Sequence, residues 1–314
     1  MGVGLPAPQA LAATGQIAGV RKRRVQRQRL VAGWLCLTPL ILINALVILG
    51  PSIATVYYSF TDWTGIGEAN FIGLENYRDL LGDANYHNAV IHVVIWTAFF
   101  LTVPIAMALL GAFLLSQIRR FQLVFRLIYF IPYTIASVVN AAIWKNIYDG
   151  NRGVVPLLAR LGVTPLEGIA PLGNTRLALP AVAWVDTWHW WGFLVVIFLA
   201  AMHSVDTALY DAVKVDGGGR WREFRDVTLP GIRPTLIFVL LLTVIGSLLV
   251  FDYIYIMTQG GPAGSTQVVG TLLYERAFRL VEAGYAAAMG LTMTMVSALV
   301  MLVYLHLRRR GWEV

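Results

Sequence analysis

Residues 211–234, "DAVKVDGGGRWREFRDVTLPGIRP", form a charged, glycine-rich block between two long apolar segments. The sequence before the block reads "LALPAVAWVDTWHWWGFLVVIFLAAMHSV", and the sequence after it reads "TLIFVLLLTVIGSLLVFDYIYIM". Each flanking segment has the roughly 20 apolar residues that a helix needs to cross a bilayer. The block therefore connects two membrane spans and must itself lie outside the hydrocarbon.

The composition predicts an all-α integral membrane protein. Apolar residues make up 58% of the 314-residue chain and charged residues only 13%, whereas an ordinary soluble domain has about 25% charged residues. None of the apolar windows has the alternating pattern of a transmembrane barrel strand. The first window follows "RKRRVQRQR" without a cleavage site, so we expect it to remain as a signal anchor. Six transmembrane helices are expected, at about 31–57, 88–117, 124–148, 178–204, 234–258 and 284–307.

Basic residues are concentrated in alternate segments of the chain. Residues 1–30 hold six Lys or Arg, 118–126 hold three, 205–233 hold five and 308–310 hold three. These 17 of the 24 basic residues share one side of the membrane if both termini are cytoplasmic. The positive-inside rule predicts that this side is the cytoplasm. Because topology accounts for the net charge of +7, we infer no nucleic-acid binding from it.

The sequence lacks the common patterns of enzymes and metal sites. It has no H-E-x-x-H, G-x-S-x-G or G-x-x-x-x-G-K-[ST] motif, its five histidines include no i, i+4 pair suited to zinc, and Cys36 is its only cysteine. We therefore expect no catalysis, metal or cofactor on this chain, and any ATP hydrolysis must take place on another. Two other classes stay open. An intramembrane enzyme would gather its acids and His189 in one cavity, and a passive channel or receptor would need no ATPase.

The charged block has an ordered spacing. Asp211-Ala212-Val213 is followed by three residues and Gly217, then by nine residues and Val227-Thr228-Leu229-Pro230. This spacing resembles the EAA loop of bacterial ABC importer permeases, which reads E-A-A, three residues, G, nine residues, I-x-L-P. The departures are Asp for Glu, Val for Ala and Val for Ile, and each keeps the chemical type. The stretch "VDGGGRWREFRDVTLPGIRP" resembles the form typical of carbohydrate-uptake permeases related to the maltose transporter's membrane subunits.

The resemblance extends over nearly the whole chain after residue 30. "FIGLENYRDLL", "FDYIYIMTQGGPAGST" and "GYAAAMG" are similar to the first external loop, the end of the penultimate core span and the start of the last span of that family. Six spans with the loop between the fourth and fifth fit the first of its two unlike permease subunits. A type I ABC importer permease fold in the bacterial inner membrane is implied. Its parts would be a cytoplasmic basic tail at 1–30, a permease domain at 31–307 with the coupling loop at 205–233, and a cytoplasmic tail at 308–314.

The resemblance also implies a function and a set of partners. The function would be that of the permease subunit of an ATP-driven, binding-protein-dependent importer of sugars or oligosaccharides, working by alternating access. The partners would be a second permease, two copies of an ABC ATPase that hold ATP and Mg²⁺, an extracytoplasmic solute-binding protein, the sugar and the lipid bilayer. The coupling loop would sit in a cleft of the ATPase and follow its closure on ATP.

The local sequence predicts the shape of the coupling loop. A short helix from near Ala208, interrupted at 217–219 and followed by a second helix, makes an elbow continuous with both flanking spans. By the resemblance, Asp211 and the arginines supply polar contacts, Ala212 gives a close fit and Gly217 permits the bend. The competing interpretation is a solvated basic loop shaped only by topology. The residues expected at the ATPase contact are Asp211, Ala212, Asp216, Gly217, Arg220, Arg222, Arg225, Leu229 and Pro230.

Two carboxylates within the predicted spans, Asp186 and Asp252, indicate a polar passage, because a charge at the centre of a membrane helix costs about 2.5–3.5 kcal/mol on insertion scales. In related transporters the sugar lies midway through the bilayer, between spans on either side of the coupling loop. Sugars suit a mixture of aromatic faces and hydroxyl-binding groups. The residues expected to line the passage are Trp188, Trp191, Gly192, Thr243, Ser247, Asp186 and Asp252.

Other interpretations of these residues stay open. Tryptophans near a membrane surface usually form an interfacial belt, and Asp252, near the outer end of its span, also suits capping or pairing. No Lys or Arg occurs within the fourth or fifth span. This disfavours a strongly anionic cargo, although a partner permease or a helix N-terminus can supply positive potential. An importer of glycerol phosphate or another polar or anionic solute is the alternative, and the sequence does not name the sugar.

Overall fold

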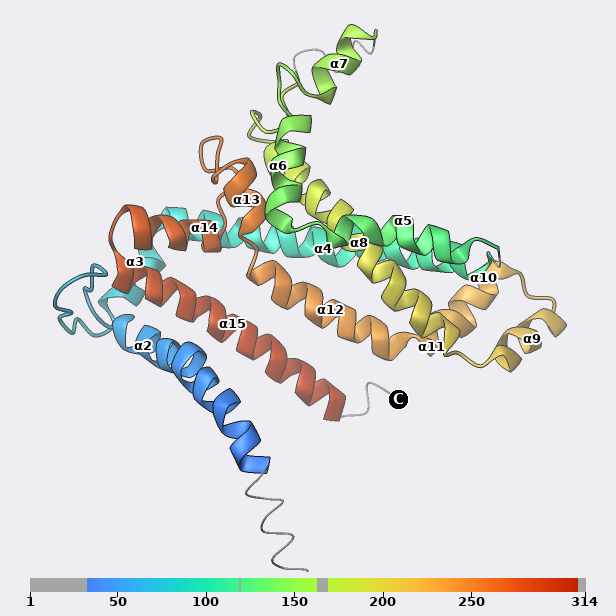
Figure 1. Cartoon of the computed structure of the whole chain (residues 1–314), viewed down its shortest axis with the longest axis horizontal. Helices are drawn as coiled ribbons and strands as arrows, with labels where there is room; N and C mark the ends of the chain where they lie inside the picture. The colour runs from blue at the N-terminus through green and yellow to red at the C-terminus, as the bar shows by residue number, and fades with distance from the viewer. Residues whose placement is uncertain (1–32, 119, 163–168, 310–314) are drawn as a thin grey trace, which may run out of the picture. The chain divides into compact units, whose positions relative to one another are not determined.

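The computed structural model describes residues 33–118, 120–162 and 169–309, and most of the chain within these ranges is helical (Figure 1). The basic tail predicted at 1–30 lies outside the described residues, as does most of the predicted C-terminal tail. The contacts divide the chain into two units, residues 1–57 and 58–314.

Apolar helices of spanning length dominate both units. The first unit contributes a helix that begins at Gly33 and includes the π-helical turn η1 (Ala45–Leu49) and α2 (Gly50–Tyr58). The second contributes α4 (Ala84–Ser116), α8 (Ala178–His203) and α15 (Ala283–Arg309). These four are long and apolar enough to cross a membrane, and two bent pairs of helices pass the same test, which gives up to six spans. The predicted six-span all-α fold agrees with this count.

The third predicted span is broken. The sequence predicts one crossing at about 124–148, whereas α5 (Gln122–Thr134) and α6 (Ser137–Ile147) meet at a 92° bend. Ile135 at the corner is extended, with φ −81° and ψ 131°. Its carbonyl oxygen lies 3.1 Å from Nε2 of His189 on α8. The break is sustained because a neighbouring helix satisfies the freed carbonyl, which composition alone does not reveal.

The fifth predicted span, 234–258, also ends early. The helix α12 (Arg233–Leu248) stops at Leu248, and a separate short helix, α13 (Asp252–Met257), follows. Between them Phe251 has φ −148° and ψ −59°, outside the helical region. Its ring packs 5.0 Å from that of Tyr255 and 5.6 Å from that of Tyr274. This tertiary packing of an apolar residue ends the helix where hydropathy predicts that it continues.

The core of the second unit forms where α4 crosses α8. Ala108 and Ala112 of α4 are fully buried in a cluster with Val195 and Phe198 of α8 and Val239 of α12. Small side chains let helix backbones approach closely in a membrane protein. The three helices are thereby held together, so α12 and α13 are placed beside α8, where the predicted passage residues lie.

The charged and polar loops gather at two ends of the second unit. In Figure 1, α9 (Thr207–Val215) and α10 (Arg220–Glu223) lie at the right end, whereas α3 (Glu75–Gly82) and α14 (Val269–Tyr274) lie at the left end. The helix α7 (Val154–Arg160) lies beyond α6. In the described residues, β structure is confined to one bridge between Thr61 and Phe71.

Candidate functional site

The charged block folds as a helical elbow, which we define as residues 206–231. Asp206 caps the N-terminus of α9, because its Oδ1 accepts a hydrogen bond from the Ala208 amide at 2.9 Å. After Val215 the chain turns through Gly217, whose φ of +71° favours glycine. The second arm runs through α10, the π-helical turn η3 (Phe224–Thr228) and α11 (Leu229–Gly231). The predicted pair of helices interrupted by glycines is therefore present.

Several contacts fasten the elbow to the spanning helices. The ring of Phe224 packs edge-on against that of Phe113 near the end of α4, at 5.0 Å. The hydroxyls of Tyr210 on α9 and Thr228 on η3 lie 3.0 Å apart and join the two arms. Val227 is buried as well. Because both arms are fixed to each other and to α4, a displacement of the elbow carries the helix end with it.

The outer surface of the elbow carries the residues predicted at the ATPase contact, and they are exposed except for the partly buried Leu229. Asp211 pairs with Lys214 at 3.1 Å, and Arg225 pairs with Asp226 at 2.9 Å. Such exposed pairs add little stability. Sequence reasoning missed two large apolar side chains on this surface, Val215, 87% exposed, and Trp221, 71% exposed. An exposed Trp among charged side chains is typical of a protein-binding surface. The position of Trp221 within the stretch that resembles the EAA loop could have indicated this role.

A pocket of about 270 Å³ lies among α4, α8, α12 and α13; we call it the solute pocket. It brings together four of the seven predicted passage residues, Asp186, Thr243, Ser247 and Asp252. Aromatic side chains also line it, including Trp96, Phe100, Trp190, Phe251 and Tyr253. The pocket thus combines carboxylates, hydroxyls and aromatic surface contributed by separate helices.

Hydrogen bonds from α6 hold one wall of the solute pocket. Ser137 Oγ donates to Asp252 Oδ2 at 2.6 Å, and Asn140 Nδ2 donates to the Tyr253 hydroxyl at 3.0 Å. The start of α13 is therefore fixed by the helix beyond the 92° bend. Sequence reasoning did not find Ser137 or Asn140, because no motif relates them to residues more than a hundred positions away.

The other three predicted passage residues do not line the solute pocket. Trp188 packs edge-on against Trp144 at 5.5 Å, and the ring of Trp191 lies 4.9 Å from that of Tyr129. At Gly192 an added Cβ would overlap the Tyr129 carbonyl oxygen, so the glycine allows α5 to cross α8. Trp190 lines the pocket in place of these tryptophans. The sequence prediction selected Trp188 and Trp191, which instead pack against α6 and α5.

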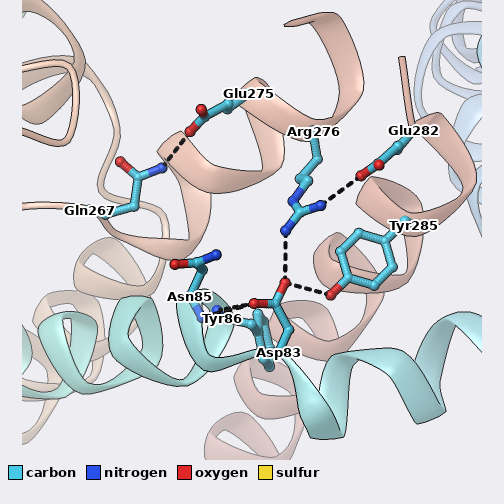
Figure 2. A network of polar contacts seen from close by, with 8 residues as sticks. All are labelled: Asp83, Asn85, Tyr86, Gln267, Glu275, Arg276, Glu282 and Tyr285. Carbon is cyan, nitrogen blue, oxygen red and sulfur yellow. Dashed lines mark hydrogen bonds and ion pairs between the residues drawn. The ribbon is translucent and has the colours of Figure 1, made fainter. Parts of the chain in front are cut away.

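A polar network joins α4, η4 (Glu275–Arg279) and α15 at the opposite end of the second unit from the elbow (Figures 1 and 2). Arg276 donates from Nη2 to Asp83 and from Nη1 to Glu282, each at 2.9 Å, and the Tyr285 hydroxyl donates to Asp83 at 2.8 Å. Asp83 also accepts from the Asn85 amide at 2.8 Å and caps α4. Because Asp83 and Arg276 are almost 200 positions apart, no local sequence pattern predicts the network.

The network changes the acidity of Asp83. Partial burial opposes ionisation, but hydrogen bonds from Tyr285 and the backbone amides, together with the Arg276 charge, hold the pKa of Asp83 below its ordinary 3.8. A carboxyl group whose pKa is lowered by folding stabilises the fold above its unfolded pKa, and this stabilisation is lost as the pH falls through the folded pKa.

We expect Asp83→Asn to lower the free energy of unfolding at neutral pH by about 1–3 kcal/mol, because Arg276 and Tyr285 lose a charged acceptor. Thermal unfolding of the assembled permease in nanodiscs would measure the loss. The difference in the free energy of unfolding between this variant and the wild type should shrink as the pH falls below about 4. Asp79→Asn removes an exposed charge from the neighbouring helix and should have little effect. A gap that stays constant down to low pH would contradict this account.

Comparison with known proteins places these features in a family. Residues 100–312 match the family described as "Binding-protein-dependent transport system inner membrane component". The diacetylchitobiose uptake permease NgcF of Streptomyces coelicolor is 33% identical, over 83% of this chain and 78% of that protein. The trehalose/maltose transport permease MalF of Thermococcus litoralis is 29% identical, over 88% of this chain and 93% of that protein.

The fold has a counterpart among solved structures. A chain of a bacterial importer of the acidic polysaccharide alginate has a TM-score of 0.80 at 23% identity, covering 92% of this chain and 98% of that chain. A chain of a bacterial alginate ABC transporter in complex with alginate pentasaccharide-bound periplasmic protein also has a TM-score of 0.80, at 22% identity, covering 93% of this chain and 98% of that chain. This likeness bears on the fold alone.

The chain belongs to the family of inner-membrane components of binding-protein-dependent transport systems, since the family match spans most of its length. It is a membrane-embedded ABC permease subunit and not an enzyme. The predicted family and the predicted all-α permease fold are confirmed.

Proposed function

We propose that this chain is one of two permease subunits of an ATP-driven importer of sugars or oligosaccharides. The observation that carries the proposal is the solute pocket, in which carboxylates and hydroxyls from three helices face aromatic side chains. Sugars need this combination, because their C–H faces pack on rings while their hydroxyls need donors and acceptors. Permeases named for diacetylchitobiose and for trehalose and maltose are similar along most of the chain.

In this proposal the elbow receives the motor's movement. A separate pair of ATPase subunits holds ATP and Mg²⁺, and their closure moves the elbow. Asp211, the exposed arginines and Ala212 contact the ATPase cleft, and Trp221 adds apolar contact. Because Phe224 fastens the elbow to α4, the movement reaches the helices around the pocket. The pocket then opens alternately to each side of the membrane.

The charge distribution supports the orientation. The elbow, the 118–126 link and both terminal segments are rich in Lys and Arg, so we place them in the cytoplasm. The Asp83–Arg276 network, at the opposite end of the second unit from the elbow, then faces outward. An extracytoplasmic solute-binding protein would land on this outer end, where α3, α14 and the loops beside them lie.

Co-purification and uptake test the proposal together. The chain would be expressed with its neighbouring transport subunits, and a nucleotide-hydrolysing subunit should co-purify with it. Removing residues 211–230 should release that subunit while the spanning helices still insert. Vesicles that contain the intact assembly and the binding protein should accumulate radiolabelled sugar only when ATP is inside. Accumulation without ATP would indicate a channel, and product formation by this chain alone would indicate an enzyme; either result would refute the proposal.

A further inference from the structure

We infer that the solute pocket selects its cargo by charge, accepting uncharged and amino-bearing sugars and rejecting acidic sugars. The inference rests on the proposed function, since it takes the pocket to be the sugar passage. It adds the chemical class of the sugar, and it assigns the selection to two residues, Asp186 of α8 and Asp252 of α13.

The described side chains that line the solute pocket include acidic groups but no basic group. Asp186 and Asp252 line the same space from different helices. Among the described residues, those that line the pocket include no Lys, Arg or His. Asp252 accepts one hydrogen bond, from Ser137, and within the described chain Asp186 forms no ion pair or hydrogen bond. The pocket therefore presents two carboxylates and no compensating cation of this chain.

The solute pocket also contains two buried hydroxyl groups without hydrogen-bond partners in the described residues. Thr243 and Ser247 lie one turn apart on α12, are only 4% and 3% exposed, and line the pocket. The Oγ atom of each has no hydrogen-bond partner in the described part of the chain. Buried hydroxyls are normally hydrogen-bonded, and leaving one unpaired costs free energy. Two such groups facing one cavity indicate a ligand that supplies the missing donors and acceptors.

An uncharged sugar matches this arrangement. Its hydroxyls donate to the carboxyl oxygens of Asp186 and Asp252, which are strong hydrogen-bond acceptors. Its ring oxygens and remaining hydroxyls accept from Thr243 and Ser247, and its apolar face packs on Trp190. A protonated amino group adds an opposite charge between the carboxylates. A carboxylated sugar instead brings a further negative charge beside these acidic groups in a partly buried space, where repulsion is weakly screened.

The experiment measures binding of three matched disaccharides to the complete permease–ATPase assembly in nanodiscs, without binding protein. The probes are cellobiose, its diamino counterpart and cellobiouronic acid, followed by tryptophan fluorescence. We expect the diamino probe to bind at least as tightly as cellobiose, and the acid to bind at least about tenfold more weakly, because like charges placed together are strongly unfavourable. Trp190→Phe should reduce the signal, which identifies the pocket as its source.

Charge-removing variants test the assignment to residues. Asp186→Asn and Asp252→Asn should each narrow the gap between cellobiose and the acid to about threefold or less. Glu68→Gln removes an exposed carboxylate outside the pocket and should leave the gap unchanged. ATPase activity without solute checks that each variant has assembled. Equal binding of neutral and acidic probes to wild type, or an unchanged gap in both Asp variants, would overturn the inference while the proposed function stands. Failure of every probe to bind, together with no sugar uptake, would overturn both.

Discussion

Replacing Gly192 with leucine is expected to prevent the permease from reaching a stable assembled state. An added Cβ at this position would overlap the backbone carbonyl oxygen of Tyr129, where α5 crosses α8. Overpacking a core typically costs about 1–3 kcal/mol when side chains can move aside. Here the obstacle is backbone, so the helices themselves must separate, and we expect a loss above about 3 kcal/mol.

The measurement is the yield and thermal stability of the permease with its partner subunits. Gly246→Ala is the matched control, since a Cβ on this α12 glycine meets nothing within 4 Å. That variant should assemble normally. If Gly192→Leu assembled with wild-type stability but failed to transport, the helix-packing role of position 192 would be contradicted. The residue would then line the passage, which is the role that the sequence analysis predicts.

Gly217→Val is expected to uncouple transport from ATP hydrolysis. The glycine has φ +71°, and the left-handed region costs an ordinary residue about 1–2 kcal/mol and is still less accessible to a β-branched one. A Cβ at this position meets nothing within 4 Å, so the effect comes from the backbone and not from a clash. We expect the turn to open, so that the α9 arm no longer fits the proposed ATPase cleft. We expect uptake to fall at least about tenfold while insertion is retained, because the strain is confined to the elbow.

Gly219→Ala provides the control for this variant. Its φ of −84° suits any residue, and an added Cβ meets nothing within 4 Å. ATP hydrolysis stimulated by the loaded binding protein, measured beside sugar uptake, separates uncoupling from a failure to assemble. Normal coupling in Gly217→Val would count against the elbow as the path of force.

Local sequence predicted the elbow well because its signals are local. The glycines at the turn and the spacing around Gly217 both act within a few residues. Hydropathy likewise located the spans, because each is a continuous apolar run. It did not locate the corner at Ile135 or the end of α12 at Leu248. Both breaks depend on side chains from other helices, which a window along one segment does not contain.

The solute pocket was predicted in part for the same reason. A charge in an apolar span is visible in sequence, so Asp186 and Asp252 stood out, and hydroxyls on the same α12 face accompanied them. The choice among neighbouring tryptophans depends on how α8 is rotated against α5 and α6. The close approach of α5 at Gly192 helps to set that rotation, and the sequence does not reveal it. The sequence prediction therefore chose Trp188 and Trp191, whereas Trp190 lines the solute pocket.

The right-angled corner between α5 and α6 has a mechanical consequence. Because α5 and α6 meet at 92°, a tilt of α5 would move α6 sideways, which a tilt of one straight helix would not do. Ser137 and Asn140 of α6 are hydrogen-bonded to Asp252 and Tyr253, which line the solute pocket. A displacement of α6 would therefore move this wall of the pocket. We therefore expect a tilt of α5 to displace α6 sideways and so to change the width of the solute pocket.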